Sequence, residues 1–264
     1  KPKRVAYSRD LGITPVDPKL KGLYVDQFGA QLEYEVLSDL SVGFDYQGRR
    51  QGTMIEDMSD DEWQRHCLST ARGFIAETGT APEIFHVAHE VRDANNRLIE
   101  STANLENINA LLISGNPLAC MNVFIRSDVA REHRFNENRE MAGLEDWELW
   151  LRMAARYPIL HAKTVAGRMH EHEGRSSNNQ NDSAQLIKRV FLFLEAVQSD
   201  PKVQEVYKHQ FHKLRSACYS FIALHMAIAG HKKLSLRYTL LAIREQPSSI
   251  FGRRFMAILK YILR

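Results

Sequence analysis

The hydrophobic pattern of this chain changes near Asp182, and that change limits the possible folds more than any other feature. Before this point, short runs rich in β-branched and aromatic residues, such as Glu83–Val91, alternate with stretches of helical spacing. After it, only helical spacing occurs, in the segments Ser183–Val197, Pro201–Ala229, Lys232–Arg244 and Ile250–Leu263. This order predicts an α/β domain followed by a helical C-terminal appendage.

The segment Glu145–Tyr157 carries the clearest helical pattern in the chain. Its large apolar residues recur at i, i+3, i+4 and i+7 and therefore share one face: Trp147, Trp150, Leu151 and Ala154. We expect both tryptophans to be core residues, and Pro158 ends the helix. The first turn holds two neighbouring carboxylates, Glu145 and Asp146, where the helix dipole favours the ionised form.

Shorter patterns predict several other elements. Ser59, with Glu62 three residues later, has the pattern of a capping box and predicts the start of a helix. A strand is expected near Thr164–Met169 and a helix over Asn104–Ile113. The polar stretch Gly43–Gly52, rich in glycine and arginine, is predicted to be a loop.

The charge, the cysteine content and the lack of long apolar runs limit the classes of protein to which the chain can belong. The 264 residues carry 35 basic and 32 acidic side chains, a net charge of +3, which gives no reason to expect a nucleic-acid partner. The cysteines, Cys67, Cys120 and Cys218, are odd in number and lack metal-binding spacing, which favours reduced thiols in a cytoplasmic protein. No apolar run reaches the roughly 18 to 20 residues of a membrane span. The basic amphipathic tail Phe251–Arg264 fits either a packed helix or one lying on the inner face of an anionic membrane.

Three motifs that follow one another in the chain resemble those of family 2 glycosyltransferases. They are the segment Asn116–Arg126, the turn Arg134–Glu137, and the acidic and aromatic run Glu145-Asp146-Trp147-Glu148-Leu149-Trp150-Leu151-Arg152. Two flanking pieces agree with that family in order and spacing: Gly52–Trp63, similar to its carboxylate-rich strand end, and Arg168–Ser177, similar to its Arg-x-His segment. The resemblance covers residues 52 to 264 and implies an inverting enzyme with a GT-A fold, a Rossmann-like mixed sheet flanked by helices.

The resemblance also implies a reaction. A hexosyltransferase of this kind moves a sugar from a nucleotide-sugar donor to a saccharide, lipid-linked or cell-envelope acceptor. A carboxylate must then take the proton of the acceptor hydroxyl. The family motif gives this catalytic role to Asp146, with Glu145 beside it. From the residues alone, the pair is also compatible with acids that stabilise a helix N-terminus.

The leaving diphosphate needs positive charge, which the resemblance assigns to a cation and to basic side chains. Asp60 and Asp61 would hold Mg²⁺ or Mn²⁺, which prefer carboxylate oxygens, and His172 would complete that metal site. Arg168, His172 and Arg175 would face the diphosphate of the donor. From the residues alone, Asp60 and Asp61 are also compatible with acids that stabilise a helix start, and His172 with a solvated loop residue.

Two departures from the family pattern keep a second hypothesis open. Met58 stands where the first aspartate of the acidic motif normally lies, and residues 1–50 match none of the segments that bind the nucleoside. We therefore divide the chain into a divergent segment, 1–50, a GT-A-like catalytic core, 51–182, and a helical region, 183–264. The alternative hypothesis is a non-catalytic GT-A-like binding module that lacks donor chemistry.

Overall fold

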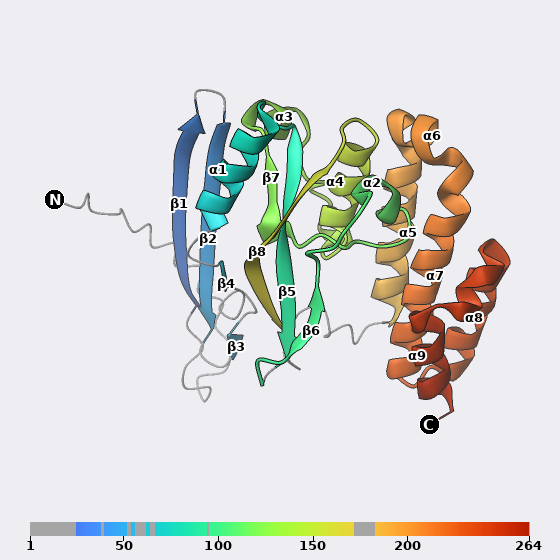
Figure 1. Cartoon of the computed structure of the whole chain (residues 1–264). Helices are drawn as coiled ribbons and strands as arrows, with labels where there is room; N and C mark the ends of the chain where they lie inside the picture. Colours follow the sequence, from blue (N-terminus) through green and yellow to red (C-terminus); the bar gives the residue numbers. More distant parts are fainter. Residues whose placement is uncertain are drawn as a thin grey trace.

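The computed structural model describes residues 25–37, 40–51, 54–55, 62–63, 67–93, 95–171 and 183–263. They form a mixed α/β fold, with a long hairpin on one side, a mixed sheet in the middle and the C-terminal helices on the other side (Figure 1). The predicted order, in which strands and helices alternate first and only helices follow, is confirmed.

The first sheet is antiparallel and has three strands: β1 (Val25–Leu37), β2 (Leu40–Gln51) and β3 (Met54–Ile55). The prediction of a loop over Gly43–Gly52 is therefore wrong. In the register of this hairpin Phe44 pairs with Leu32 and Val42 with Tyr34, so the residues on either side of Gly43 take part in the ladder with β1. Such pairing outweighs the weak strand preference of the glycines.

The second sheet contains the order β4 (Glu62–Trp63), β8 (Leu160–Glu171), β5 (Ile84–Asp93) and β6 (Leu98–Ser101), with β7 (Val123–Ile125) also paired to β5. β5 and β8 run parallel, whereas the other pairs are antiparallel. The sheet is therefore mixed. The strands predicted over Glu83–Val91 and near Thr164–Met169 correspond to β5 and to part of β8.

Two helix predictions in this part of the chain need correction. Glu62 and Trp63 form β4, and the first helix, α1 (Cys67–Thr78), begins eight residues after Ser59. The pairing of β4 with β8 gives the backbone of Glu62 and Trp63 hydrogen-bond partners, which outweighs a local capping preference. Over Asn104–Ile113, only α2 (Ile108–Leu111) is helical, and the side chain of Asn107 caps it by accepting from Ala110 N.

One face of the central sheet is covered by α1. Cys67, Ala71 and Ile75 of this helix are buried against β5 and β8, where Phe85 and Ala162 belong to the same small core. The ring of Phe85 stacks on Phe124 of β7 at a centroid distance of 5.0 Å. This cluster fixes one side of the sheet and leaves the other side for the larger core.

The remaining helices are α3 (Ser127–Glu132), α4 (Glu145–Ala154), α5 (Ser183–Ser199), α6 (Pro201–Tyr207), α7 (Phe211–Ile228), α8 (Lys232–Glu245) and α9 (Arg253–Ile262). The helix predicted over Pro201–Ala229 is divided by a 3-10 turn at Lys208–Gln210. The predicted helices Pro201–Ala229 and Lys232–Arg244 are separated at Gly230, as expected: its φ of 80° is left-handed, and His231 N donates to Met226 O to close the end of α7.

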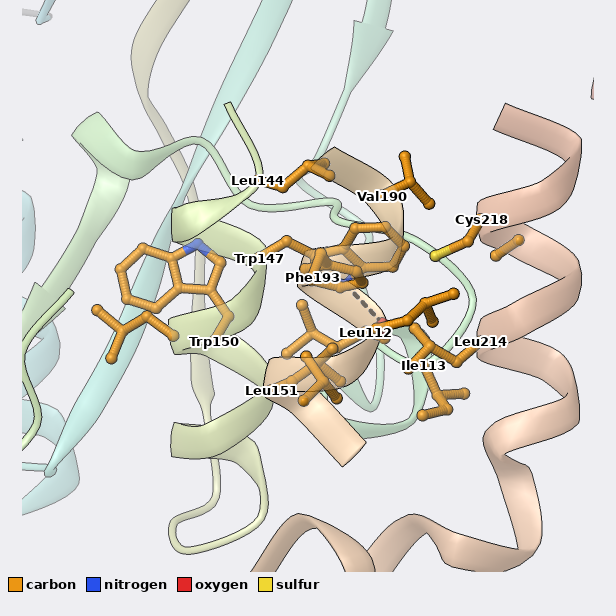
Figure 2. Packing of buried hydrophobic residues seen from close by; sticks show 14 of the residues in the cluster. Leu112, Ile113, Leu144, Trp147, Trp150, Leu151, Val190, Phe193, Leu214 and Cys218 are labelled. Carbon is orange, nitrogen blue, oxygen red and sulfur yellow. Dashed lines mark hydrogen bonds between the residues drawn. The ribbon is translucent and has the colours of Figure 1, made fainter. Parts of the chain in front are cut away.

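The larger core lies between the sheet, α4 and the C-terminal helices (Figure 2). Trp147 stacks on Phe193 of α5 at 4.6 Å, and its indole Nε1 donates to Leu112 O at 2.8 Å. Trp147 is 7% exposed and Trp150 1%, so the prediction that both are core residues is confirmed. Because this core continues to Ile258 in α9, the C-terminal helices share it with the α/β part.

Among the helices of the described residues, we find none with the length and apolar character of a transmembrane span.

Candidate functional site

The start of α4 is shaped by a tight turn that ends in a carboxylate pair. Gly143 has a φ of 91°, a left-handed conformation that favours glycine, and its N–H donates to Oε2 of Glu145. Glu145 therefore folds back onto the turn that leads into its own helix. This contact assigns Glu145 to positioning the first turn of α4 and leaves Asp146 as the carboxylate with a different environment.

Asp146 is partly buried and accepts hydrogen bonds at both oxygens. Nδ2 of Asn116 donates to Oδ2 at 3.0 Å, and the backbone N of Trp147 donates to Oδ1 at 2.6 Å. Burial and, to a lesser extent, the charge of Glu145 together raise the pKa of the carboxyl to about 6, although both hydrogen bonds oppose the rise. The carboxyl therefore titrates close to neutral pH, where a general base works best.

Two residues that the sequence did not single out lie beside this carboxyl. Asn116 is fixed by its own loop, because its Oδ1 accepts from Leu118 N at 3.1 Å. Cys120 lies on the 3-10 turn before β7. Desolvation of its sulfur raises the pKa of the thiol to about 11, and the negative charges of Asp146 and Glu145 contribute to the rise. The thiol thus stays protonated at neutral pH. The only sequence signal for Asn116 was its place at the start of the first glycosyltransferase-like segment.

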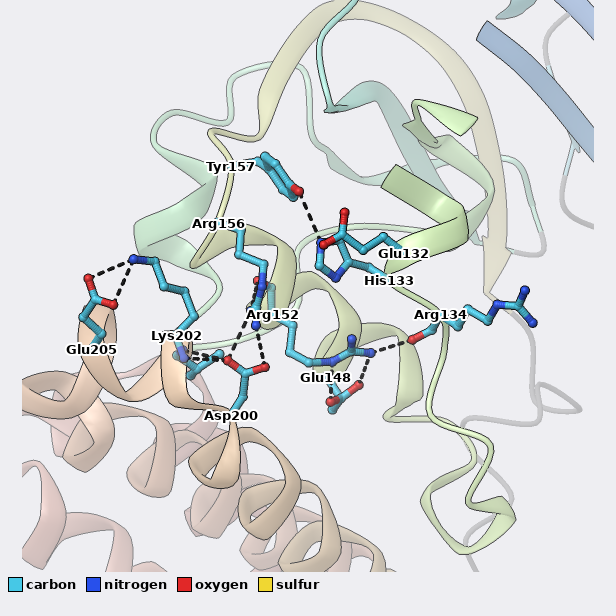
Figure 3. Close-up of polar contacts among 11 residues, drawn as sticks. Glu132, His133, Arg134, Glu148, Arg152, Arg156, Tyr157, Asp200, Lys202 and Glu205 are labelled. Atoms are coloured by element: carbon cyan, nitrogen blue, oxygen red, sulfur yellow. Dashed lines mark hydrogen bonds and ion pairs between the residues drawn. The ribbon is translucent and has the colours of Figure 1, made fainter. Parts of the chain in front are cut away.

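The rest of the acidic and aromatic run anchors α4 (Figure 3). Arg152 donates to both carboxylate oxygens of Glu148, at 2.7 and 3.0 Å, an ion pair between residues four apart on one face of the helix. Arg152 also donates to Arg134 O at 2.7 Å, which ties the preceding loop to the helix. At the other end, Arg156 pairs with Asp200 at 2.9 Å and joins α4 to α6. These contacts are structural, and they leave Asp146 as the chemically available carboxylate of the motif.

Of the residues predicted to bind the donor and the metal, Arg168 is described and lies on β8. Asp60, Asp61, His172 and Arg175 lie outside the described residues. Arg168 pairs by register with Glu62 of β4. Since the two strands are antiparallel, the N-terminal end of β4 and the C-terminal end of β8 lie at the same end of the sheet.

Three histidines form a contiguous cluster on the central strands. His86 Nδ1 lies 3.1 Å from His161 Nδ1, and His86 Nε2 lies 3.2 Å from His89 Nδ1. Burial lowers the pKa of His86 to about 2, and the two neighbouring imidazoles add to this effect. His86 is therefore a neutral core residue. Within the described part of the chain, no group of three or more His, Cys, Asp or Glu side chains is placed to hold a metal ion.

Comparison with known proteins gives a limited result. No protein-family model matches the chain. The chain is similar to the TonB-dependent transporter Oar of Myxococcus xanthus, with 37% identity over 71 residues. The match covers 26% of this chain and 7% of the transporter. The similarity thus concerns a small part of a much longer protein and assigns this chain to no family.

Proposed function

We propose that this chain is a metal-dependent, inverting glycosyltransferase of the GT-A kind, with Asp146 as its general base. It would transfer a sugar from a nucleotide-sugar donor to a hydroxyl of a saccharide, lipid-linked or cell-envelope acceptor. The observation that carries the proposal is the carboxyl of Asp146, which lies in the first turn of α4 with a pKa raised to about 6. The acidic and aromatic motif carries the family resemblance, and the raised pKa of Asp146 suits the proton transfer that a general base performs.

The environment of Asp146 favours a base over a helix cap. A capping carboxylate gains from the helix N-terminus and titrates low, as Asp200 does at the start of α6: burial opposes the change, but hydrogen bonds from Arg156 and Val203 N lower its pKa. The pKa of Asp146 is raised instead. A carboxylate with a pKa of about 6 is mostly ionised at neutral pH yet holds a proton well enough to accept one from a hydroxyl.

The reaction balances with this assignment. Asp146 takes the proton of the acceptor hydroxyl as the acceptor oxygen forms a bond to the anomeric carbon of the donor sugar. The bond from that carbon to the diphosphate oxygen breaks, and the diphosphate leaves with the electron pair. Attack from the face opposite the leaving group inverts the anomeric centre. Asn116 holds the Asp146 carboxylate in place while the proton moves.

The donor side of the site is proposed from the chemistry of its residues. Asp60, Asp61 and His172 would hold Mg²⁺ or Mn²⁺, for which carboxylate oxygens are suitable ligands. When bound, such an ion supplies Lewis-acid stabilisation to a leaving diphosphate. Arg168 and Arg175 would contact the diphosphate directly. The shared sheet end of β4 and β8 supports this grouping, because β4 begins just after Asp61 and β8 ends just before His172.

The test is release of nucleotide from UDP- and dTDP-sugars by the full chain, with Mn²⁺ or Mg²⁺ present. We expect Asp146→Asn to lose a factor of roughly 10² to 10⁴ in the rate of transfer or hydrolysis. Asp128→Asn is the matched control, since Asp128 also lies in the first turn of a helix but is exposed and bound to Arg126. The control should keep full activity. Equal rates for wild type and Asp146→Asn would reject the base assignment.

The same experiment addresses the alternative of a non-catalytic binding module, which the methionine at position 58 favours. Such a module would release no nucleotide from a sugar nucleotide under any metal condition, and wild type and Asp146→Asn would behave alike. A chain that binds no sugar nucleotide at millimolar concentration would argue strongly against the glycosyltransferase hypothesis.

A further inference from the structure

The outer face of α8 carries two leucines between basic side chains. Leu236 is 54% exposed and Leu240 58% exposed, and the basic residues Lys233, Arg237 and Arg244 beside them are exposed as well. These positions lie three or four residues apart, so they form one continuous stripe along the helix. We call this set, Lys233, Leu236, Arg237, Leu240 and Arg244, the basic apolar face.

The opposite face of α8 is fixed against α7. Ser235 Oγ donates to Ala223 O at 2.8 Å, and Ser216 Oγ donates to Ala242 O at 2.9 Å. These buried hydroxyl contacts bring the two helices close together, and Tyr238 is only 7% exposed between them. Helix α8 therefore cannot rotate to bury its leucines, and its basic apolar face stays exposed. The helix itself lies at the outer edge of the C-terminal helices (Figure 1).

The basic apolar face contains an open depression between its side chains. A shallow depression of about 540 Å³ is lined by Lys233, Leu236, Arg237, Leu240, Leu241 and Arg244. Its lining combines three aliphatic side chains with three cationic ones. A partner that fits it must offer both an apolar surface and negative charge.

The following helix repeats this composition. On α9 the exposed side chains are Arg253, Met256 and Lys260, and Phe251 just before it is 84% exposed. From Lys232 to Leu263 the chain has seven basic residues and one acidic residue, Glu245. Glu245 is neutralised by Arg215 at 2.8 Å. The whole segment is therefore strongly cationic and has exposed apolar side chains among its charges.

We propose that the basic apolar face docks on an anionic lipid surface. The leucines would enter the boundary between headgroups and acyl chains, and the lysine and arginine side chains would contact lipid phosphates. A second copy of the chain is a poor occupant, because like charges would meet across the interface. Nucleic acid would engage the charges but leave the leucines in water. This inference is independent of glycosyl transfer.

The test is co-sedimentation of the full chain with vesicles of phosphatidylcholine, with or without about one third phosphatidylglycerol. We expect binding to the anionic vesicles only, weakened strongly when salt is raised from about 0.1 M to about 0.5 M. Leu236→Ser with Leu240→Ser should lower the partition coefficient by about tenfold or more. Lys233→Glu with Arg237→Glu should lower it by at least about thirtyfold.

The matched control is Leu98→Ser with Ile99→Ser on β6, because these side chains are 54% and 55% exposed on another element. This variant should bind vesicles as the wild type does, and circular dichroism should show all three variants folded. Equal loss of binding in the β6 variant would overturn the proposal, as would equal binding to neutral vesicles. A dimer in light scattering that the Leu236→Ser and Leu240→Ser variant abolishes would assign the face to self-association instead and would also overturn it.

Discussion

Replacing Asp146 with asparagine is expected to stabilise the fold at neutral pH, although the variant loses the proposed base. Burial raises the pKa of this carboxyl from its ordinary value of 3.8 to about 6. Below pH 3.8 the carboxyl is neutral in both the folded and the unfolded state, so its full contribution to stability is present there. That contribution is lost as the pH rises through 6, because the folded carboxylate must then ionise in a desolvated position.

The magnitude follows from the difference between the two pKa values. About two pKa units correspond to about 3 kcal/mol of unfavourable ionisation once both states are charged. Asparagine has nearly the same size, has no charge to bury and can still accept from Trp147 N. Its amide nitrogen then faces Asn116 Nδ2, another donor, so the hydrogen bond from Asn116 is lost. We therefore expect Asp146→Asn to raise the free energy of unfolding at about pH 7.5 by roughly 1 to 2 kcal/mol, the ionisation cost minus the lost hydrogen bond.

Urea unfolding at a series of pH values measures this effect directly. The difference between variant and wild type should shrink as the pH falls from about 7 to about 4, while histidine titration cancels in the comparison. Asp200→Asn is the control, because its carboxyl has a lowered pKa and pairs with Arg156, so its loss should destabilise the protein at neutral pH. A destabilised Asp146→Asn variant, or a difference that does not change with pH, would refute the environment assigned to Asp146.

Three further predictions concern the core. The pKa of His86 is lowered from 6.5 to about 2, so the unfolded state alone takes up this proton below pH 6.5. The free energy of unfolding should therefore fall by about 1.4 kcal/mol per pH unit below that point, and a His86→Phe variant should show a shallower fall in urea titrations. Trp147→Phe loses the hydrogen bond to Leu112 O and part of the contact with Phe193, and should cost about 2 to 3 kcal/mol in urea unfolding. A Cβ at position 167 would lie 2.3 Å from Asn122 Oδ1, so Gly167→Ala should lower the melting temperature, and adding Asn122→Ala should recover much of the loss in a double-mutant cycle.

The helical half of the fold was predictable because its pattern is local. Apolar residues at a period of 3.6 define α4, α5 and α8 without reference to any distant segment. The predicted helix over Lys232–Arg244 differs from α8 by one residue at its end. The break at Lys208–Gln210 was missed, because its residues are compatible with a continuous helix.

The strands were harder to predict, because pairing is a long-range property. Nothing near Glu62 in the sequence indicates that it pairs with Arg168, more than a hundred residues away. Likewise, Gly43–Gly52 has the composition of a loop, but most of it forms a strand because its backbone pairs with β1. Local preferences, such as that of a capping box for a helix or of glycines for a loop, are outweighed when distant backbone groups become hydrogen-bond partners.

The candidate site was located by its motif, but its electrostatics were not predictable. The sequence placed Glu145 and Asp146 together at a helix start, where the dipole argument predicts a lowered pKa. The structure gives the opposite sign for Asp146, because surrounding residues remove water from the carboxyl and Glu145 adds like charge. The contact with Asn116 comes from a loop thirty residues upstream, so no local pattern could reveal it.

The unfavourable ionisation of Asp146 can persist only because α4 cannot move to relieve it. Fraying of the first turn would return the carboxylate to water and recover about 3 kcal/mol. That motion would pull Trp147 away from Phe193 and from Leu112 O, a loss of similar or greater size. Further along, the pairing of Arg152 with Glu148 and its bond to Arg134 O hold the helix to its neighbouring loop. The aromatic and charged residues of the motif thus hold the carboxylate of Asp146 in a desolvated position, where its pKa is raised. This position does not stabilise the helix, whereas a raised pKa suits the proposed general base.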